Sequence, residues 1–315
     1  MDRLWQLSAG PTKRRYSEVL LRHGVALIGP GNTGSWRPDR SDDAFEGSTI
    51  RRFAVEARVG DPVVMRIGTS GITAVGLFAG EYEHLPQFDD VFGWDLQHAR
   101  RVRWCALPED YEFGTTVFGG MPTRFSAVGG AEVLEYVERF LKSPPSEWQY
   151  APLPSLPALE PALDEVPPAV SDLVALAHDV HELYWSDAHF GELPREDELL
   201  VHFVVPLLRQ LGWPPERIAI KWRNADVTVF RALPRTPENV HLLFEAKRLG
   251  EGIEFALDQA RGYLDAQGVA RDVIVTDGIR YRYYEAAKDF APTAYANLAN
   301  LKQSAVHLFN KLRRP

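Results

Sequence analysis

The run Leu242-Leu243-Phe244-Glu245-Ala246-Lys247 ends an apolar segment with a glutamate and a lysine two residues apart. An apolar segment of this length predicts a buried β-strand, over Val240–Ala246. Because residues two apart on a strand point to the same face, Glu245 and Lys247 project together, and Ala246 points into the core. Burying charged groups at the end of a strand costs desolvation free energy, so such groups are expected there only if they serve a function. The pair therefore marks a candidate site for chemistry.

A second acidic residue, Asp226, opens the preceding expected strand, Asp226–Arg231. If the two strands form a hairpin, Asp226 approaches Glu245. Two carboxylates held together suit a hard divalent cation such as Mg²⁺, or Mn²⁺. A lysine beside that cation can orient or deprotonate water and offset the charge of a phosphate. The pattern predicts phosphodiester hydrolysis, with Asp226 and Glu245 as metal ligands.

The surrounding sequence predicts a mixed sheet flanked by helices, because helical and strand periodicities alternate along it. An apolar stripe predicts a first helix that ends before Gly212 and is kinked or divided at Pro206. The expected elements are helices Glu196–Leu211 and Ile253–Gln267, and strands Arg217–Trp222, Asp226–Arg231, Val240–Ala246, Asp272–Thr276 and Tyr281–Glu285.

These motifs, in this order, resemble the PD-(D/E)XK nucleases, and in particular the nuclease domain at the start of type I restriction-enzyme motor subunits. Asp226 matches the metal-binding aspartate, although Ala225 replaces the proline of the motif. Glu245 and Lys247 match the ExK pair. The alternative for this pair is a strand with a surface salt bridge.

The resemblance extends over roughly residues 190–290. Glu196 matches a helical acidic residue ahead of the segment Pro206–Trp213, with Glu198 as the alternative. Gln259 and Tyr263 match a Q-x-x-x-Y helix that lies near the site in this family. Val273–Glu285 resembles the late strands. The resemblance implies catalytic roles for Asp226, Glu245, Lys247, Glu196 and Gln259.

The N-terminal half has no cluster of catalytic residues and is expected to be mostly β-structure. The segment Ile28–Ser35, IGPGNTGS, lacks the lysine that phosphate-binding loops place before the serine, so it predicts a glycine turn and no nucleotide hydrolysis. The expected elements are helices Lys13–Arg22 and Glu132–Lys142, and strands Val25–Ile28, Pro62–Ile67, Ile72–Phe78 and Ala99–Leu107.

Short segments of this half resemble, in their order, the EVE/YTH group within the PUA-like fold, which are small β-barrels that read modified bases. They are Gly60–Val64, Ile72–Gly76, Gly80–Tyr82, Gly93–Asp95 and Arg101–Trp104. The resemblance implies a pocket that stacks a flipped base on aromatic side chains. Candidates are Trp36, Phe53, Phe92 and Trp94, with Trp5 weaker, and Arg51 and Arg52 for DNA contact. Core packing is the alternative for each aromatic residue.

The formal net charge is −8, but half of this excess lies in residues 143–168, which hold four acidic and no basic side chains. Basic clusters in the near-neutral remainder can still face DNA, with solvated surface charge as the alternative. They are Lys13–Arg15, Arg51-Arg52, Arg100–Arg103 and Arg313-Arg314. Eight of the 23 prolines fall in residues 143–169, which predicts a semi-rigid linker.

The single cysteine, Cys105, excludes an intrachain disulfide, and a buried inert thiol is expected. No segment has the length and composition of a membrane span or a leader, so a cytoplasmic protein is expected. His178, Asp179, His181 and His189 are interpreted as an exposed helix face rather than a metal site.

Together these patterns predict an α+β protein: a PUA-like (EVE-like) β-barrel with helices over 1–142, a linker over 143–169, and an α/β restriction-endonuclease-like domain over 170–315. The predicted function is a Mg²⁺-dependent, modification-dependent (type IV-like) restriction endonuclease. Its expected partner is double-stranded DNA with a modified base, cut by a homodimer. The alternatives are a nucleic-acid-binding protein with an inactive nuclease fold, and a nuclease subunit that needs a separate ATP-driven partner.

Overall fold

The structure, a computed structural model, divides the chain into two compact units, Met1–Leu159 and Glu160–Pro315. Within the described part of the chain, no helix is long and apolar enough to cross a membrane. The described residues are 3–10, 15–29, 31, 34–38, 49–92, 94–119, 124–159, 171–173, 175–176, 179, 195–248, 253, 255–269, 271–298, 301 and 303–314.

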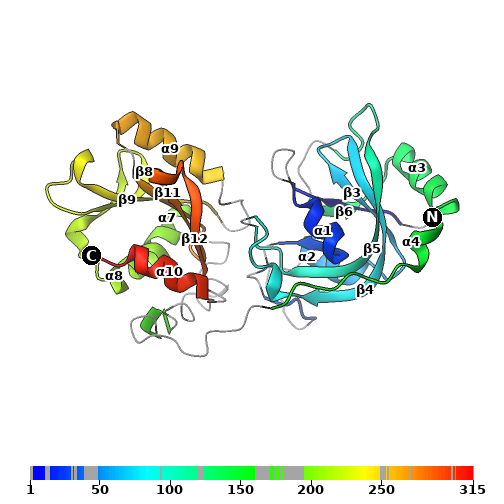
Figure 1. The fold of residues 1–315 in the computed structure, drawn as a ribbon, viewed down its shortest axis with the longest axis horizontal. Helices are drawn as coiled ribbons and strands as arrows, with labels where there is room; N and C mark the ends of the chain where they lie inside the picture. Colours follow the sequence, from blue (N-terminus) through cyan, green and yellow to red (C-terminus); the bar gives the residue numbers. More distant parts are fainter. Residues whose placement is uncertain are drawn as a thin grey trace. The chain divides into compact units, whose positions relative to one another are not determined.

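The first unit is built on a six-stranded mixed sheet that curls into a half-barrel (Figure 1). Strands β1 and β3 are parallel, and the other paired strands are antiparallel. Register shifts within β4 let this long strand bend with β5. In spatial order the strands are β2 (Val25–Ile28), β5 (His98–Glu112), β4 (Gly71–His84), β3 (Pro62–Ile67), β1 (Trp5–Ser8) and β6 (Phe125–Ala127).

Aromatic side chains fill the concave core of this sheet. The rings of Trp5 and Phe125 stack at 4.8 Å, and Phe53 packs edge-on against Phe125 at 5.0 Å and Phe78 at 6.3 Å. Phe53 is 0% exposed. It comes from the π-helical turn η2 (Arg52–Glu56), which follows α2 (Thr49–Arg51). The ring of Phe53 therefore has no face open to a base, and its place is that of a core residue.

Part of the proline-rich segment lies on the first unit. After α3 (Ala131–Lys142), the short helix α4 (Ser146–Tyr150) buries Trp148, whose indole N–H donates to the Arg103 carbonyl at 3.2 Å. The guanidinium groups of Arg101 and Arg103 donate to the carbonyls of Pro154 and Ala151. The basic cluster at 100–103 therefore binds the protein's own backbone, and residues 148–154 contact β5 rather than spanning open solvent.

The second unit is a six-stranded mixed sheet with helices on both faces (Figure 1). β9 and β10 are parallel, and the other neighbours are antiparallel. The strands lie in the order β12 (Ala291–Asn297), β11 (Arg280–Glu285), β10 (Asp272–Thr276), β9 (Val240–Ala246), β8 (Ala225–Phe230) and β7 (Ile218–Trp222). With the first unit, this confirms the expected α+β class.

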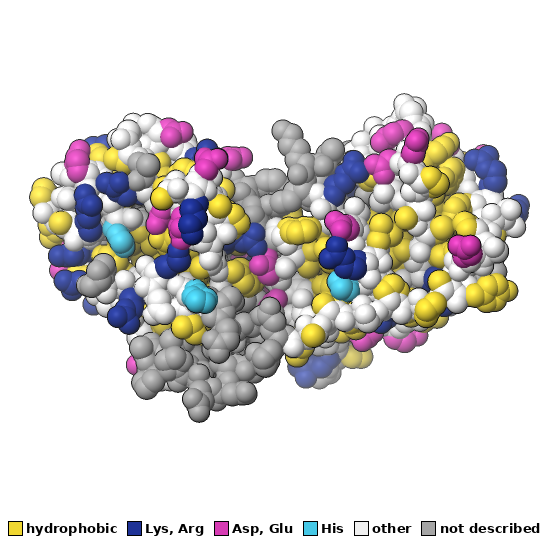
Figure 2. All heavy atoms as spheres, viewed as in Figure 1, with side chains coloured by type: hydrophobic (Ala, Val, Ile, Leu, Met, Phe, Trp, Pro, Cys, Tyr) yellow, Lys and Arg dark blue, Asp and Glu magenta, His cyan; other side chains and the backbone are white. Residues whose placement is uncertain are grey.

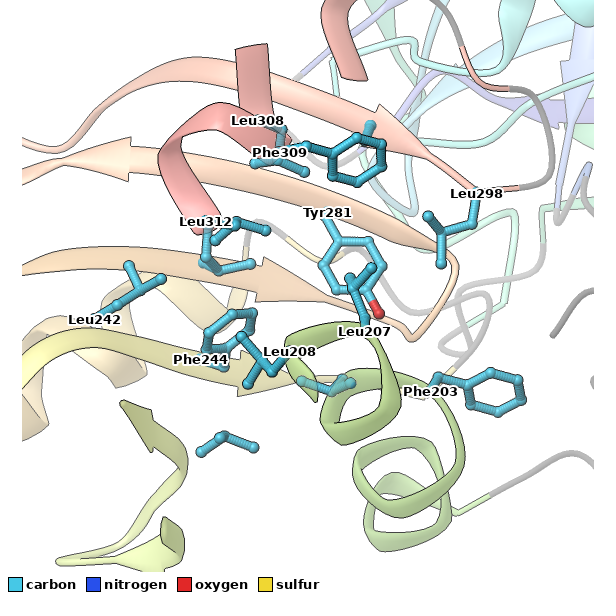
Figure 3. Close-up of a cluster of buried hydrophobic side chains, with 14 of the residues drawn as sticks. Phe203, Leu207, Leu208, Leu242, Phe244, Tyr281, Leu298, Leu308, Phe309 and Leu312 are labelled. Atoms are coloured by element: carbon cyan, nitrogen blue, oxygen red, sulfur yellow. The ribbon is translucent and has the colours of Figure 1, made fainter. Parts of the chain in front are cut away.

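One face of this sheet packs on α8 (Val205–Gln210) and α10 (Gln303–Leu312), where Phe244 meets Leu208 and Tyr281 lies near Leu207 (Figure 3). The other face packs on α9 (Phe255–Gln267), whose Ala260 and Leu264 share a buried cluster with Leu243. Ala246 belongs to the first cluster and is 0% exposed, so it points into the core as its strand position predicts.

The helix expected over Glu196–Leu211 contains a π-helical turn. α7 (Glu196–Leu199) continues into η4 (Leu200–Val204) and then α8, in whose first turn Pro206 lies. The N–H of Val205 donates to the Leu200 carbonyl, five residues back. The wider turn accommodates the proline, which has no N–H to donate. Gly212 ends the helix with φ +89, a conformation that glycine adopts without strain.

Candidate active site

Asp226 and Glu245 lie on adjacent antiparallel strands. Val227 of β8 pairs with Phe244 of β9, and the same register continued by one residue places Asp226 opposite Glu245. Side chains directly opposite one another project from the same face of a sheet. Both are buried, at 4% and 1% exposure. The hairpin assumed from the sequence is therefore present, and it brings the two carboxylates together.

Asp226 has a hydrogen-bond partner on each oxygen. Its Oδ2 accepts the backbone N–H of Ala246 at 2.7 Å, and its Oδ1 accepts Lys221 Nζ at 2.6 Å. The first bond ties the start of β8 to the end of β9. The end of β9 is also held from its other side, because Lys247 N donates to the Thr276 carbonyl of β10 at 2.8 Å. The acidic pair therefore rests on rigid strands.

The carboxylate of Glu245 has fewer hydrogen-bond partners than that of Asp226. Its Oε2 is buried and has no hydrogen-bond partner among the described residues, and its Oε1 lies 3.6 Å from Lys247 Nζ. Burial, reinforced by the charge of Asp226, raises the pKa of Glu245 to about 7, against the opposing effect of Lys247. A buried carboxylate with an unpartnered oxygen beside a second carboxylate favours the binding of a cation.

Lys247 lies at the centre of the remaining candidate residues. Its Nζ donates to Gln259 Oε1 at 2.9 Å and is 4.0 Å from Glu196 Oε1. Gln259 Nε2 in turn donates to the Tyr263 hydroxyl at 2.6 Å. The Lys247 side chain keeps 16% exposure, so its ammonium is positioned yet reachable from solvent. The structure thus brings together Glu245 and Lys247 from the end of β9 with Gln259 of α9 and Glu196 of α7.

The structure distinguishes Glu196 from Glu198. Glu198 Oε2 accepts the backbone N–H of Arg195 at 2.7 Å, so this carboxylate caps the start of its own helix. Glu196 faces Lys247 instead. Between them, Asp197 lies 3.3 Å from Lys221 Nζ.

Sequence reasoning missed Lys221 and Asp197. The ammonium of Lys221 bridges Asp226 and Asp197, and the two carboxylates outweigh partial burial to raise the pKa of Lys221 to about 12. The signal in the sequence was the position of Lys221, on the strand that pairs with the start of β8. It could be recognised only once the β7–β8 register was known.

Among the described residues, no group of three or more His, Cys, Asp or Glu side chains has the geometry of a metal site. The available donor set is the two carboxylates of Asp226 and Glu245. Mg²⁺ commonly binds proteins through one or two carboxylates and completes its shell with water and substrate phosphate. The unpartnered Oε2 of Glu245 fits that requirement. Of the histidine cluster expected on an exposed helix face, Asp179 is exposed, and His178, His181 and His189 lie outside the described residues.

In the first unit, the segments that carry Trp36 and Trp94 meet. Gly31 N donates to the Asp95 carbonyl at 3.3 Å, and Trp36 N donates to the Tyr82 hydroxyl at 2.9 Å. A Cβ on Gly31 would lie 2.4 Å from Asp95 Oδ1, so this close approach requires glycine. The glycine turn expected in this segment therefore packs one loop against the other.

The exposure of the aromatic candidates differs. Trp36 and Trp94 are half-buried against the core, whereas Phe92 is 50% exposed and has φ +50. Arg51 is exposed and lies 3.6 Å from Glu56, and Arg52 is half-buried in the first turn of η2. On the face of the first unit that Figure 2 draws, Lys and Arg side chains are interspersed with Asp and Glu. Cys105 is half-buried, not buried as expected.

Comparisons with known proteins give weak similarities only. A family described as a domain of unknown function (DUF8426) matches residues 5–120. No curated protein matches the chain. A fragment of a type I restriction-enzyme HsdR subunit from Vibrio vulnificus matches with a TM-score of 0.26 and 16% identity. That match covers 38% of this chain and 25% of the other, so the chain spans about a quarter of its length.

Two further structures match at a similar level. The YTH domain of a Zygosaccharomyces rouxii protein, in complex with N6-methyladenosine RNA, has a TM-score of 0.28 and 10% identity, over 44% of this chain and 86% of that one. A protein of Agrobacterium tumefaciens has a TM-score of 0.26 and 15% identity, over 50% of this chain and 99% of that one. At these values, a functional assignment has to come from the site itself.

Proposed function

We propose that the chain is a modification-dependent (type IV-like) restriction endonuclease: a divalent-metal-dependent nuclease of restriction-endonuclease-like fold in the second unit, with a PUA-like reader of modified bases in the first. One observation carries the nuclease proposal. Two buried carboxylates meet on adjacent strands, with an amine two residues beyond one of them and hydrogen-bonded to a glutamine on the next helix.

Asp226 and Glu245 would hold Mg²⁺ or Mn²⁺. When bound, such a cation stabilises the charge of the scissile phosphate and lowers the pKa of coordinated water. The fit rests on hard oxygen donors, on their burial, and on the unpartnered Glu245 Oε2.

The other residues position charge and protons. The Lys247 ammonium, directed by Gln259 Oε1, supplies a positive charge beside a phosphate oxygen and a donor that orients the attacking water. Tyr263 accepts the Gln259 amide and so fixes which end of that amide faces Lys247. Glu196, whose Oε1 lies 4.0 Å from the Lys247 ammonium, would help to hold it in place by electrostatic attraction.

The reader proposal rests on the contact between the loops that carry Trp36 and Trp94, on the hydrogen bond from Trp36 N to the Tyr82 hydroxyl, and on the exposed ring of Phe92. Stacking of a base between aromatic faces is sequence-tolerant, and it suits the capture of a base flipped out of the duplex. Phe53 has no part in this proposal because its ring is enclosed in the core.

The test of the whole proposal is cleavage of plasmid DNA by the purified full chain. Modified and unmodified plasmids are incubated with Mg²⁺, with Mn²⁺, or with a chelator, without ATP. Metal-dependent cutting of modified DNA alone supports the proposal. Equal cutting of both plasmids would contradict the proposed reader function. The absence of cutting of either plasmid would contradict the proposed nuclease function. Linear products at low enzyme concentration would indicate paired active sites in a homodimer, whereas nicked circles would indicate a single site.

Replacing Trp36 by alanine is expected to weaken binding of modified DNA about tenfold, which corresponds to the loss of one stacked base. Binding of unmodified DNA should change little. Fluorescence anisotropy with paired oligonucleotides measures both affinities. Tyr150, which is 84% exposed in the same unit, gives the control variant Tyr150→Ala. Equal losses on both DNAs, or a loss in the control, would contradict a pocket at Trp36.

A further inference from the structure

Lys221 occupies the position from which a cation would approach Asp226. Its Nζ is 2.6 Å from Asp226 Oδ1, while Asp226 Oδ2 is already bonded to the Ala246 N–H. Both oxygens of Asp226 are therefore engaged. A divalent ion bound to Oδ1 would share this oxygen with the ammonium and be repelled by its positive charge.

The backbone at Lys221 is held in an unusual conformation. Ile220 pairs with Val227 and Trp222 with Ala225, so Lys221 stands opposite Asp226 between them. Its φ is +53, a left-handed conformation that side chains with a Cβ rarely adopt. The two-residue turn beyond it, Arg223-Asn224, has positive φ as tight hairpins require, but Lys221 lies outside that turn. Strain of this kind gathers at functional positions.

The side chain of Lys221 is exposed enough for its ammonium to move away from Asp226. Its side chain is 47% exposed, whereas that of Asp226 is 5% exposed. Asp197, the second partner of the ammonium, is 79% exposed and lies 3.3 Å from Nζ. The ammonium can thus leave Asp226 for solvent, for Asp197, or for a phosphate, while Asp226 stays fixed.

We propose that Lys221 is a built-in counter-cation: it neutralises Asp226 in the metal-free protein and competes with the divalent ion for that carboxylate, so that it sets the metal affinity of the site. This inference rests on the proposed nuclease site. Lys221 is a positioning residue, since it acts through Asp226. Lys247 has a different arrangement, because it contacts Glu245 and Gln259.

The test measures Mn²⁺ binding to the full chain by calorimetry, without DNA, so that it does not depend on cleavage. Lys221→Gln and Lys221→Met, two neutral variants, should each bind Mn²⁺ about tenfold more tightly than the native protein, because a positive charge beside the ligand is removed. Lys221→Arg keeps the charge and should bind like the native protein. Lys288→Gln removes a lysine that pairs with Glu285 in the same unit and should change nothing.

The outcomes separate this inference from the nuclease proposal. Unchanged or weaker Mn²⁺ binding in both neutral variants, with their folding checked by circular dichroism, overturns the role of Lys221 and leaves the nuclease proposal standing. Tighter Mn²⁺ binding by the neutral variants, without DNA cleavage by any of the proteins, supports Lys221 as a competing cation and contradicts the nuclease proposal. Asp226→Asn should abolish binding in every background, and the absence of binding in all proteins overturns both ideas.

Discussion

Lys247→Ala is expected to reduce metal-dependent DNA cleavage by about a thousandfold, the scale seen when one preorganised donor is removed from an active site. The ammonium of Lys247 lies 3.6 Å from Glu245 Oε1 and 2.9 Å from Gln259 Oε1, and alanine removes both contacts with the charge. DNA affinity should change little, because one partly buried lysine makes a small share of any phosphate interface. Single-turnover cleavage and anisotropy binding measure the two quantities separately.

The control for Lys247→Ala is Lys288→Ala, which removes a 60% exposed lysine of the same unit. Its cleavage rate should match that of the native protein. Gln259→Leu offers a finer comparison: Lys247 keeps its charge but loses the acceptor that directs it, so an intermediate loss is expected. If Lys247→Ala cleaves at the native rate, the active site has been misplaced. If it loses DNA binding as well, its role is in binding rather than catalysis.

The core of the candidate site could be predicted because its signals are local. An apolar strand ending in Glu245 and Lys247, preceded by Asp226 at the start of another strand, implies that the side chains meet if the two strands pair. The structure shows that pairing. Gln259 and Tyr263 came from the resemblance and do contact the site.

Lys221 and Asp197 could not be found in the same way. Their roles depend on the register of β7 against β8 and on where the start of α7 falls, and neither is encoded by a short motif. The choice between Glu196 and Glu198 had the same difficulty, because both lie in one helical turn. A hydrogen bond from the Arg195 backbone N–H to the Glu198 carboxylate decides it.

The fold shows the same division between local and distant signals. Strands with strong apolar runs were expected close to their observed bounds, such as β3 and β9. The short strand β6 was not expected, because three residues carry no periodicity and this strand depends on its pairing with β1. Phe53 was one candidate for stacking on a base, with core packing as the alternative, and the structure places it in the core.

The other large effect concerns Glu245 in the metal-free protein. The folded-state pKa of Glu245, about 7, lies above the ordinary value of 4.5, so the folded state holds this proton more tightly than the unfolded state does. The resulting stability is fully present below pH 4.5 and is lost as pH rises through 7. At about 1.4 kcal/mol per pH unit, the loss is roughly 3 kcal/mol by pH 8.

Glu245→Gln should therefore make the chelator-treated protein more stable at pH 8 than the native chain, while removing the stabilisation by Mn²⁺. Glutamine keeps the shape but carries no charge to desolvate. Urea unfolding at pH 5, 6, 7 and 8 measures the difference in the free energy of unfolding between the variant and the native protein. The first unit is the same in both proteins, so its contribution cancels. Glu285 provides the opposite control, since Lys311, Lys288 and Thr293 lower its pKa to about 2. Glu285→Gln should destabilise the protein at neutral pH. If the free energy of unfolding of the native protein does not change between pH 5 and 8, Glu245 is not buried beside a second carboxylate.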